Sequence, residues 1–364
     1  MIKLLQASLA ARDGARALHR SPGEGHEPDE ALEGRKHRAV LEDYELAYRA
    51  ELHKLDFDLV HAHDATTIGC AANAVMAKET GPRSRLVYDA HEYARGLSNL
   101  PAAVRDVNVA LEQASIGTAD AVLTVSPVLA RLLQRDHALS QLPGLVLNAP
   151  LAAAFDPDSP LSVRASVGLA DDVPLAVYAG IAKPLRGVDT VVRALPLLPE
   201  LHVAVVVNTP HVPVVKALVS EAERSGCAER LHLLPYVDQD QVTNYLRTAD
   251  VGLYPLLRSG NTELAWPTKI FEYLHAGLPM VVSDMPSMSQ LVTEQGWGEV
   301  FKADDHESFA AAMQRVLAHP GTYDAGLRDE AVRERFSWER QARTLIDTYD
   351  RLLLVDESEG LKRA

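Results

Sequence analysis

Residues 267–284 read PTKIFEYLHAGLPMVVSD, a short helical pattern followed at once by an apolar run. Pro267 is typical of a helix start, and Gly277 is typical of the residue just past a helix end. The run MVVSD that follows has the continuous apolar character of a strand buried on both faces. A helix that leads directly into such a strand predicts an α/β fold with a parallel sheet.

This helix combines an apolar face with a charged one. We expect the apolar face to consist of Ile270, Phe271 and Leu274, and the residues turned away from it to be Lys269, Glu272 and Tyr273. A lysine and a glutamate three residues apart usually form a weak surface ion pair, worth about 0.2–0.5 kcal/mol. The alternative is a ligand that lies against the helix, and other strand ends of the chain bear on that choice.

The same alternation of apolar runs and helical patterns extends along most of the chain. The first-half runs are FDLVHAH (57–63), RLVYDAH (85–91), AVLTVS (121–126) and GLVLNAP (144–150), with helices near 66–79, 101–117 and 127–135. From residue 175 the runs are LAVYAG, HVAVVVN, RLHLLPYV, DVGLYPL, MVVSD and GEVFKA, again with helices between them. Apolar runs joined by helices predict right-handed β–α–β units, and therefore two doubly wound domains in tandem.

A segment rich in proline and aspartate, NAPLAAAFDPDSP (148–160), reads as the linker between the halves. We predict an N-terminal domain over 1–150 and a C-terminal domain over 160–335. The segment 336–364 has apolar residues at helical spacing but no strand after it, so we expect a helix that packs back on the N-terminal domain. Parallel sheets bind ligands at the carboxyl ends of their strands, which predicts a site in the cleft between the domains.

Composition and charge exclude several classes of protein. The 364 residues carry a formal net charge of −14, so neither nucleic acid nor an anionic membrane is expected as the main partner. Cys70 and Cys227 lie in apolar helical contexts in different halves, and we expect both to be reduced. The chain has no apolar run long enough for a transmembrane helix and no signal-peptide pattern. We predict a cytoplasmic protein with at most peripheral membrane contact.

The first 56 residues give the weakest pattern. MIKLLQAS (1–8) reads as a strand or the start of a helix, and SPGEGHEPDEALEG (21–34) reads as a polar loop. The basic cluster RKHR (35–38) has acidic neighbours on both sides. A solvated loop or helix end is therefore favoured there over a patch that contacts a membrane surface.

Two strand ends in the second half carry residues suited to a phosphorylated sugar. The stretch VYAGIAKPLRGVDT (177–190) passes from a strand through Gly180 into a loop with Lys183 and Arg186, and then into a helix. Cations and free backbone N–H groups at a helix start favour a diphosphate, although an ordinary strand–helix turn looks similar. The loop RSGNTELAWPTK (258–269) leads into the helix of Glu272, whose carboxylate can accept both hydroxyls of a ribose.

Two strand ends in the first half place histidine beside an acid, in LVHAHDATT (59–67) and VYDAHEYARG (87–96). A metal site is one interpretation. However, HAHDAT lacks the further Asp-His of metallo-β-lactamase-like hydrolases, and alternate strand residues point to opposite faces. We therefore predict no metal site. For each histidine, a hydrogen-bonded structural role remains the alternative to a functional one.

The second half resembles the donor-binding domain of retaining GT-B glycosyltransferases of glycosyltransferase family 4 (group 1). The matching segments run from VYAG (177–180) through PTKIFEYLHAGLPMVVSD to RFSWERQA (335–342). The first half resembles the acceptor domain of that family from DFDLVHAHDATTIG (56–69) to ADAVLTVSPVLARLL (119–133). The resemblance implies a GT-B fold, in which two Rossmann-like domains face each other across a cleft. It implies transfer of a sugar from a nucleoside diphosphate sugar to an acceptor hydroxyl with retention, without metal or cofactor, in glycan or glycoconjugate biosynthesis.

The resemblance also implies roles for individual residues. Its catalytic residues would be His91 near the donor sugar and phosphate, Arg186 at the diphosphate and Glu272 at the ribose. The donor nucleotide and diphosphate site would comprise Gly180, Lys183, Arg186, Tyr236, Val237, Thr268, Lys269 and Glu272. The donor-sugar loop would be Asn261, Thr262, Glu263 and Leu264, and the acceptor side His63, Asp64, Glu92 and Tyr93.

Three features depart from the family pattern. Leu264 stands where the family has a glutamate eight residues before Glu272, and Ile181 replaces a basic residue directly after the glycine. The family's first strand and glycine-rich acceptor loop are not recognisable before residue 57. Two alternatives therefore stay open: a non-catalytic nucleotide-sugar-binding partner or regulatory protein on a degraded GT-B fold, and a sugar-nucleotide epimerase. For the transferase, the implied partners are a UDP-sugar and an unidentified acceptor, whether saccharide, lipid-linked glycan or small molecule.

Overall fold

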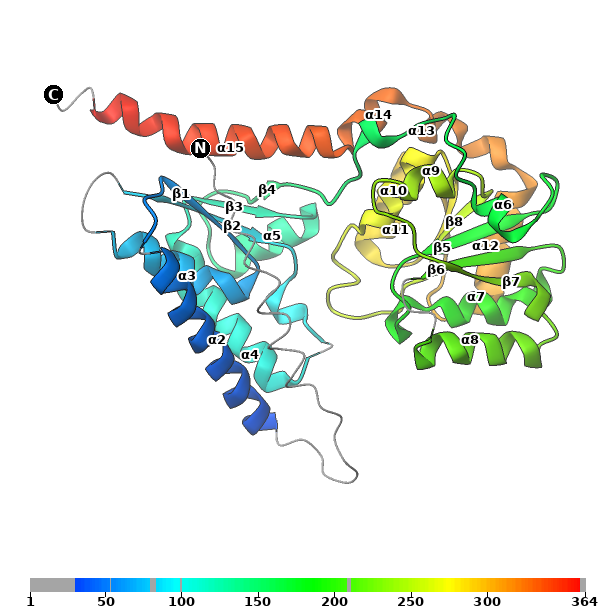
Figure 1. The fold of residues 1–364 in the computed structure, drawn as a ribbon, viewed down its shortest axis with the longest axis horizontal. Helices are drawn as coiled ribbons and strands as arrows, with labels where there is room; N and C mark the ends of the chain where they lie inside the picture. The colour runs from blue at the N-terminus through cyan, green and yellow to red at the C-terminus, as the bar shows by residue number, and fades with distance from the viewer. Residues whose placement is uncertain (1–29, 53, 79–82, 99, 208–210, 361–364) are drawn as a thin grey trace.

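The computed structural model describes residues 30–52, 54–78, 83–98, 100–207 and 211–360. Within them the strands form two separate parallel sheets, one in each half of the chain, and a long C-terminal helix lies over the N-terminal half (Figure 1). The expected α/β class with two parallel-sheet, Rossmann-like domains is confirmed. The segment MIKLLQAS (1–8) lies outside the described residues.

The first sheet has four strands in sequence order, β1 (Leu59–His63), β2 (Arg85–Ala90), β3 (Ala121–Thr124) and β4 (Gly144–Leu145). Every neighbouring pair is parallel. The connecting helices are α3 (Ala65–Met76), α4 (Ala102–Ser115) and α5 (Pro127–Asp136). One face of the sheet packs on these helices through buried apolar side chains such as Leu86, Tyr88 and Ile68. All four strands lie within the runs predicted from the sequence.

The second sheet has six parallel strands in the order β10-β9-β8-β5-β6-β7. Their bounds are β5 (Leu175–Ala179), β6 (His202–Val207), β7 (Leu231–Pro235), β8 (Val251–Tyr254), β9 (Met280–Ser283) and β10 (Gly298–Phe301). The chain starts at β5, adds strands on one side and then returns to add strands on the other. The strand order therefore reverses between β5 and β8, and such a reversal opens a crevice at the carboxyl ends of the strands.

Helices cover this second sheet on both faces (Figure 1). They are α6 (Val163–Val167), α7 (Val188–Ala194), α8 (Pro213–Arg224), α9 (Val242–Leu246), α10 (Thr268–Ala276), α11 (Pro286–Gln295), α12 (His306–Ala318), α13 (Asp324–Leu327) and α14 (Glu330–Arg335). The central strands β5, β8 and β9 are buried along their whole length because they lie between these two helical layers. The resulting core fixes the strand ends that carry the predicted site.

The last helix, α15 (Trp338–Gly360), leaves the C-terminal domain and lies along the first sheet (Figure 1). It packs on that sheet through Leu345, Tyr349 and Leu352, which lie against the buried cluster of Val87, Leu123 and Val146. The Tyr349 hydroxyl adds a polar contact, a hydrogen bond of 2.6 Å with His61 Nδ1. The expected return of the C-terminal helix to the N-terminal domain is confirmed. The contact uses one narrow stripe, because Ile346 and Leu353 on the flanks remain 54% and 38% exposed.

The prediction of a polar loop over 21–34 is wrong for residues 30–34, because these residues begin the helix α2 (Glu30–Leu52). It packs against α3 and α4, with Leu41 buried and the Asn73 amide donating to the Glu45 carboxylate at 2.5 Å. The basic cluster RKHR (35–38) belongs to this helix and is largely exposed. A polar helix of this kind is stabilised by tertiary contacts rather than by a wide apolar stripe.

Two further expectations concern the cysteines and the membrane. Cys70 and Cys227 are both free and buried, as predicted. Over the part of the chain that the structure describes, no helix is both long enough and apolar enough to cross a membrane.

Candidate functional site

The charged face of α10 is buried rather than solvated. Lys269 Nζ lies 2.7 Å from Glu272 Oε2 and donates a second hydrogen bond of 2.8 Å to the hydroxyl of Tyr236. Glu272 is only 3% exposed. Burial alone would lower the pKa of Lys269, but the Glu272 carboxylate and the Tyr236 hydroxyl outweigh it and leave the pKa raised. The pair is therefore a fixed part of a protein wall rather than a mobile surface bridge.

Tyr273 corrects the sequence-based assignment of faces on this helix. It was expected to turn away from the core, yet it is fully buried, and its hydroxyl donates to the carbonyl oxygen of Leu253 at 2.9 Å. The helix lies against β8 on this side, so a side chain that seemed polar reaches a strand carbonyl. Only the turn carrying Lys269 and Glu272 faces the cleft.

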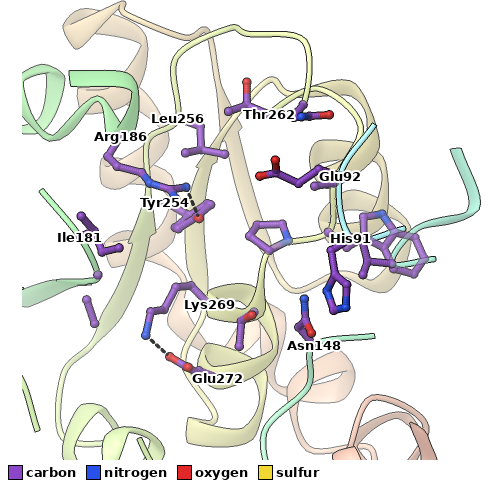
Figure 2. Close-up of a pocket in the computed structure, with 18 of the residues that line it drawn as sticks. His91, Glu92, Asn148, Ile181, Arg186, Tyr254, Leu256, Thr262, Lys269 and Glu272 are labelled. Carbon is purple, nitrogen blue, oxygen red and sulfur yellow. Dashed lines mark hydrogen bonds and ion pairs between the residues drawn. The ribbon is translucent and has the colours of Figure 1, made fainter. Parts of the chain in front are cut away.

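A cavity of about 570 Å³ lies between the two domains, beside this turn. The C-terminal domain supplies most of the wall, from the loops after β5, β7 and β8 and from the start of α10, while His91 and Glu92 enter from the loop after β2 (Figure 2). The cavity is thus located where the strand order of the second sheet reverses. The predicted site residues that line it are His91, Glu92, Gly180, Arg186, Tyr236, Asn261, Thr262, Leu264, Thr268, Lys269 and Glu272.

The other predicted residues of the donor side do not line the cavity. Lys183 is exposed, although its charge acts on the Glu92 carboxyl across the cleft. Val237 packs against the core of the C-terminal domain. Glu263 points toward Arg258, with 3.8 Å between their charged atoms, so it does not supply the carboxylate that Leu264 lacks.

The remaining acceptor-side predictions lie just behind the cavity wall. His63 and Asp64 end β1, and Asp64 Oδ1 accepts a hydrogen bond of 3.2 Å from the backbone N–H of His91. Tyr93 follows the loop, and its hydroxyl donates to the carboxylate of Asp136. These residues hold the loop that presents His91 and Glu92 rather than facing the cavity themselves.

Arg186 is positioned by a tyrosine that the sequence pattern did not single out. Its Nη1 donates to the hydroxyl of Tyr254 at 2.9 Å (Figure 2), and burial raises the pKa of Tyr254, so this hydroxyl stays neutral. The turn before α7 ends at Gly187 with φ of 64°, where a Cβ would lie 1.9 Å from the carbonyl oxygen of Pro255. A residue other than glycine would therefore displace the Arg186 loop from β8.

Other lining residues were also missed, among them Asn148, Tyr178, Gln239 and Trp266. Two of the missed residues, Tyr178 and Tyr254, could have been predicted, because they lie near the ends of the apolar runs LAVYAG and DVGLYPL. A polar-tipped aromatic side chain at the carboxyl end of a buried strand commonly faces a binding crevice.

His91 and Glu92, the titratable side chains that the N-terminal domain contributes to the cavity, both have raised pKa values. The contact of His91 with the Asp89 carboxylate, 3.1 Å from Nε2, raises the pKa of that imidazole. Partial burial and then repulsion from Asp64 raise the pKa of Glu92, against the opposing effect of Arg186 and Lys183. The cavity thus has a cationic side from the C-terminal domain and titratable groups on the opposite side.

The loop before α10 bridges the two domains. Asn261 Oδ1 accepts a hydrogen bond of 3.0 Å from the backbone N–H of Tyr93, and the carbonyl of Leu264 accepts one of 2.7 Å from the hydroxyl of Ser126. Gly260 packs so closely on Gly96 that a Cβ at Gly260 would lie 2.6 Å from the Gly96 carbonyl oxygen. These contacts close one side of the cavity.

Two family models match the chain. Residues 173–319 match the model described as Glycosyl transferases group 1, and residues 8–141 match the model described as Glycosyltransferase Family 4. A D-inositol 3-phosphate glycosyltransferase of Xylanimonas cellulosilytica is 28% identical, covering 83% of this chain and 74% of the relative. That of Mycolicibacterium gilvum is 26% identical, covering 55% and 45%. In most of these curated relatives the match spans about half of the relative's length.

Solved structures share the two-domain arrangement. Sucrose-phosphate synthase of Thermosynechococcus elongatus has a TM-score of 0.70 at 19% identity, covering 87% of this chain and 79% of the other. Anabaena HepE in complex with UDP and glucose has a TM-score of 0.68 at 16% identity, covering 86% and 81%. At such identities the likeness concerns the fold, which is GT-B. The chain thus has a GT-B fold, with residues 173–319 similar to group 1 glycosyl transferases and residues 8–141 similar to Glycosyltransferase Family 4.

Proposed function

We propose that this protein is a retaining glycosyltransferase that transfers a sugar from a nucleoside diphosphate sugar, of the UDP-sugar class, to an acceptor hydroxyl. The observation that carries the proposal is the cavity wall formed by Arg186, Lys269 and Glu272 at the point where the strand order reverses. This wall combines a fixed guanidinium with one buried carboxylate. HepE, which shares this fold, forms complexes with UDP and with UDP-glucose, and this supports the same class of donor.

Donor binding follows from the chemistry of that wall. The Glu272 carboxylate accepts hydrogen bonds from the two ribose hydroxyls, and Lys269, 2.7 Å away, keeps it oriented. The base lies toward Tyr236, which follows β7 and lines the cavity. Arg186, held by the Tyr254 hydroxyl, pairs with the diphosphate, as its planar guanidinium suits two phosphate oxygens at once.

The transfer step uses the same groups. As the bond between the anomeric carbon and the diphosphate oxygen breaks, both electrons stay on that oxygen and negative charge grows beside Arg186. A fixed cation stabilises this charge more in the transition state than in the bound donor, which lowers the barrier. The acceptor hydroxyl attacks on the face that the diphosphate leaves, and its proton passes to the leaving phosphate. The proposal therefore requires no carboxylate base, and it assigns no metal or organic cofactor to the step.

The N-terminal domain orients the sugar and the acceptor. His91 faces the cavity with its backbone held by Asp64 and its ring beside Asp89, so it is placed to bind a hydroxyl of the transferred sugar. Glu92, with its raised pKa, faces the incoming acceptor. The contacts between Tyr93 and Asn261 hold the domains together over the cavity, which excludes water and suppresses hydrolysis of the donor.

The proposal is tested by incubating the protein with UDP-, GDP- and dTDP-sugars and a panel of saccharide, lipid-linked and small-molecule acceptors. We expect one donor class to yield a product whose anomeric configuration, read by nuclear magnetic resonance, equals that of the donor. Thermal unfolding with each nucleotide defines the donor first, since a ligand at 100 times its Kd adds about 2.7 kcal/mol of stability. Stabilisation without any product would favour the non-catalytic binding protein, and a sugar altered without acceptor would favour the epimerase.

A further inference from the structure

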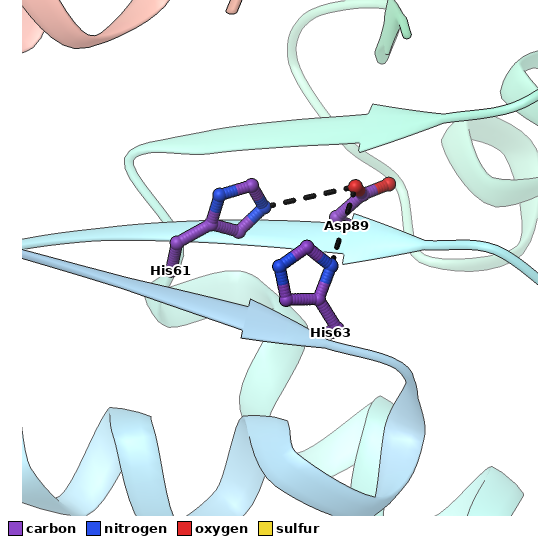
Figure 3. Close-up of side chains that lie close together, drawn as sticks. All are labelled: His61, His63 and Asp89. Atoms are coloured by element: carbon purple, nitrogen blue, oxygen red, sulfur yellow. Dashed lines mark ion pairs between the residues drawn. The ribbon is translucent and has the colours of Figure 1, made fainter. Parts of the chain in front are cut away.

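A separate cluster of functional side chains lies on the face of the first sheet that α15 covers. His61 and His63 project from the same face of β1, and Asp89 of β2 lies opposite His63 in the parallel register (Figure 3). The two imidazole rings stack with 4.2 Å between their centroids. Strand alternation separates His63 from its neighbour Asp64, but it places His61 and His63 on the same face. The prediction of no metal site considered only the first of these two consequences.

The distances in this cluster are those of groups that share a cation. Asp89 Oδ2 lies 3.7 Å from His61 Nε2 and 3.5 Å from His63 Nδ1, and one ligand atom from each of the three residues lies within 4.8 Å of the others. Both contacts are too long for good hydrogen bonds. Ligands bound to zinc at about 2.0–2.2 Å in a tetrahedral arrangement lie about 3.4 Å from one another. A small inward movement of each side chain completes such an arrangement.

Two atoms of the cluster lack partners where burial demands them. His61 Nε2 and Asp89 Oδ1 are buried without a hydrogen bond, and the Asp89 side chain is only 6% exposed. Native proteins rarely leave buried polar atoms in this condition unless an ion or water satisfies them. A cation between the His61 ring and the Asp89 carboxyl gives both groups a partner.

The surroundings support His61 in the way that metal ligands are usually supported. Its Nδ1 is hydrogen-bonded at 2.6 Å to the hydroxyl of Tyr349 on α15, which leaves Nε2 directed into the cluster. Histidine ligands almost always have their second nitrogen held by such a partner. Asp89 also contacts His91 at 3.1 Å, so the cluster lies directly behind a cavity residue.

We propose that His61, His63 and Asp89 form a binding site for one divalent cation of the zinc class. Two imidazoles and one carboxylate are a common set of three protein ligands for zinc, with a fourth position left to water or another ligand. His63, whose side chain is 55% exposed, provides access from solvent. Bound there, the cation joins the ends of β1 and β2 and anchors the ring that Tyr349 of α15 contacts. This site is independent of the proposed transfer reaction, which uses no metal.

The test is titration of untagged, EDTA-treated protein with Co²⁺, followed by its visible absorption, and competition by Zn²⁺. We expect one equivalent of Co²⁺ with the intense bands of a four- or five-coordinate site. His63→Ala and Asp89→Asn should weaken binding at least tenfold. His232→Ala is the matched control, because His202 and His232 form a similar stacked pair on neighbouring strands of the second sheet. It should bind Co²⁺ as the wild type does.

Several results would overturn the site. The site is overturned if the wild type binds Co²⁺ no more tightly than His63→Ala does. It is also overturned if His232→Ala loses as much Co²⁺ affinity as His63→Ala. We expect both variants to fold, because His63 is exposed and asparagine keeps the shape of Asp89. Thermal unfolding in EDTA checks this, and each variant should unfold at the wild-type temperature. Tyr349→Phe leaves His61 Nδ1 unsupported and should weaken the affinity by about 10-fold or more. An unchanged affinity there would reject the supporting role of Tyr349.

Discussion

Glu272 and Lys269 form a buried ion pair whose carboxylate also faces the cavity. We predict that Glu272→Gln weakens UDP binding at least tenfold, because a hydrogen bond to a charged group contributes about 1.5–3 kcal/mol and 1.4 kcal/mol is tenfold in affinity. Isothermal titration calorimetry measures this change. Glu263→Gln is the matched control, since Glu263 faces Arg258 rather than the cavity. Equal losses in the two variants would contradict the assignment of Glu272.

In the proposed reaction, Arg186 stabilises the transition state more than the bound donor. We predict that Arg186→Ala lowers kcat by about 10²–10³, the loss typical for one preorganised group facing developing charge. Arg193→Ala is the control, because Arg193 on α7 pairs with Asp189 and Asp304 away from the cavity. Steady-state kinetics with the identified donor checks both variants. An Arg186→Ala enzyme with an unchanged kcat would remove the guanidinium from the transfer step.

Residues at strand ends were predictable because parallel sheets gather their carboxyl ends at one edge. Arg186, Glu272 and His91 follow such strand ends, the family resemblance implied their roles in the cleft, and all three line the cavity. Tyr254 was missed because its contact with Arg186 joins residues 68 positions apart. Tyr273 was placed on the wrong face because helical spacing does not reveal that α10 is buried on two sides.

At the scale of elements, the start of α15 is tied to the linker by Glu339. Its two carboxylate oxygens accept hydrogen bonds of 3.0 Å from the backbone N–H groups of Ala152 and Ala153. Burial alone would raise the pKa of Glu339, but these N–H groups outweigh it and hold the pKa below its usual value. A lowered pKa in the folded state means that the stabilisation is complete above the unfolded pKa and is lost as pH falls through the folded pKa.

We therefore predict that Glu339→Gln lowers the free energy of unfolding by about 1 kcal/mol at pH 7, with a difference that shrinks as the pH falls below about 4.5. Urea denaturation at a series of pH values measures it. Glu334→Gln, an exposed change nearby on α14, should show a smaller and steadier difference. A pH-independent effect of Glu339→Gln would contradict the charge-dependent anchor.

The strands and α15 were predictable from apolar periodicity, because each must bury a continuous face. α2 was not, because its residues are mainly polar and Leu41 is one of its few buried side chains. Its position depends on contacts such as Asn73 with Glu45, which join elements distant in the sequence. Periodicity therefore reports what an element buries, and it fails where hydrogen bonds between side chains replace burial.

At the scale of the whole molecule, Gly260 and Gly96 let the two domains approach beside the cavity. We predict that Gly260→Ala separates the domains, because the added Cβ would lie 2.6 Å from a backbone oxygen. Sugar transfer should fall about 10- to 100-fold, as expected for a misplacement near 1 Å, while UDP affinity changes little. Small-angle scattering and kinetics test this together. Gly117→Ala, where a Cβ meets open space, should change neither quantity, and a Gly260→Ala protein equally unchanged would contradict the closure.

The pairing of two facing domains was predictable from the repeated strand–helix pattern and the linker. The contacts that set their distance were not, because Tyr93 and Asn261 are 168 positions apart and bond through a backbone N–H that no pattern marks. The sequence therefore predicted a site between the domains, but it did not predict which contacts close the cavity there.

The most direct measurement is a crystal structure of the protein with UDP bound. It should show the ribose hydroxyls within hydrogen-bond distance of Glu272, the diphosphate at Arg186 and the base beside Tyr236. UDP bound outside this cavity, or bound within it with the ribose away from Glu272 and the diphosphate away from Arg186, would contradict the proposed donor site.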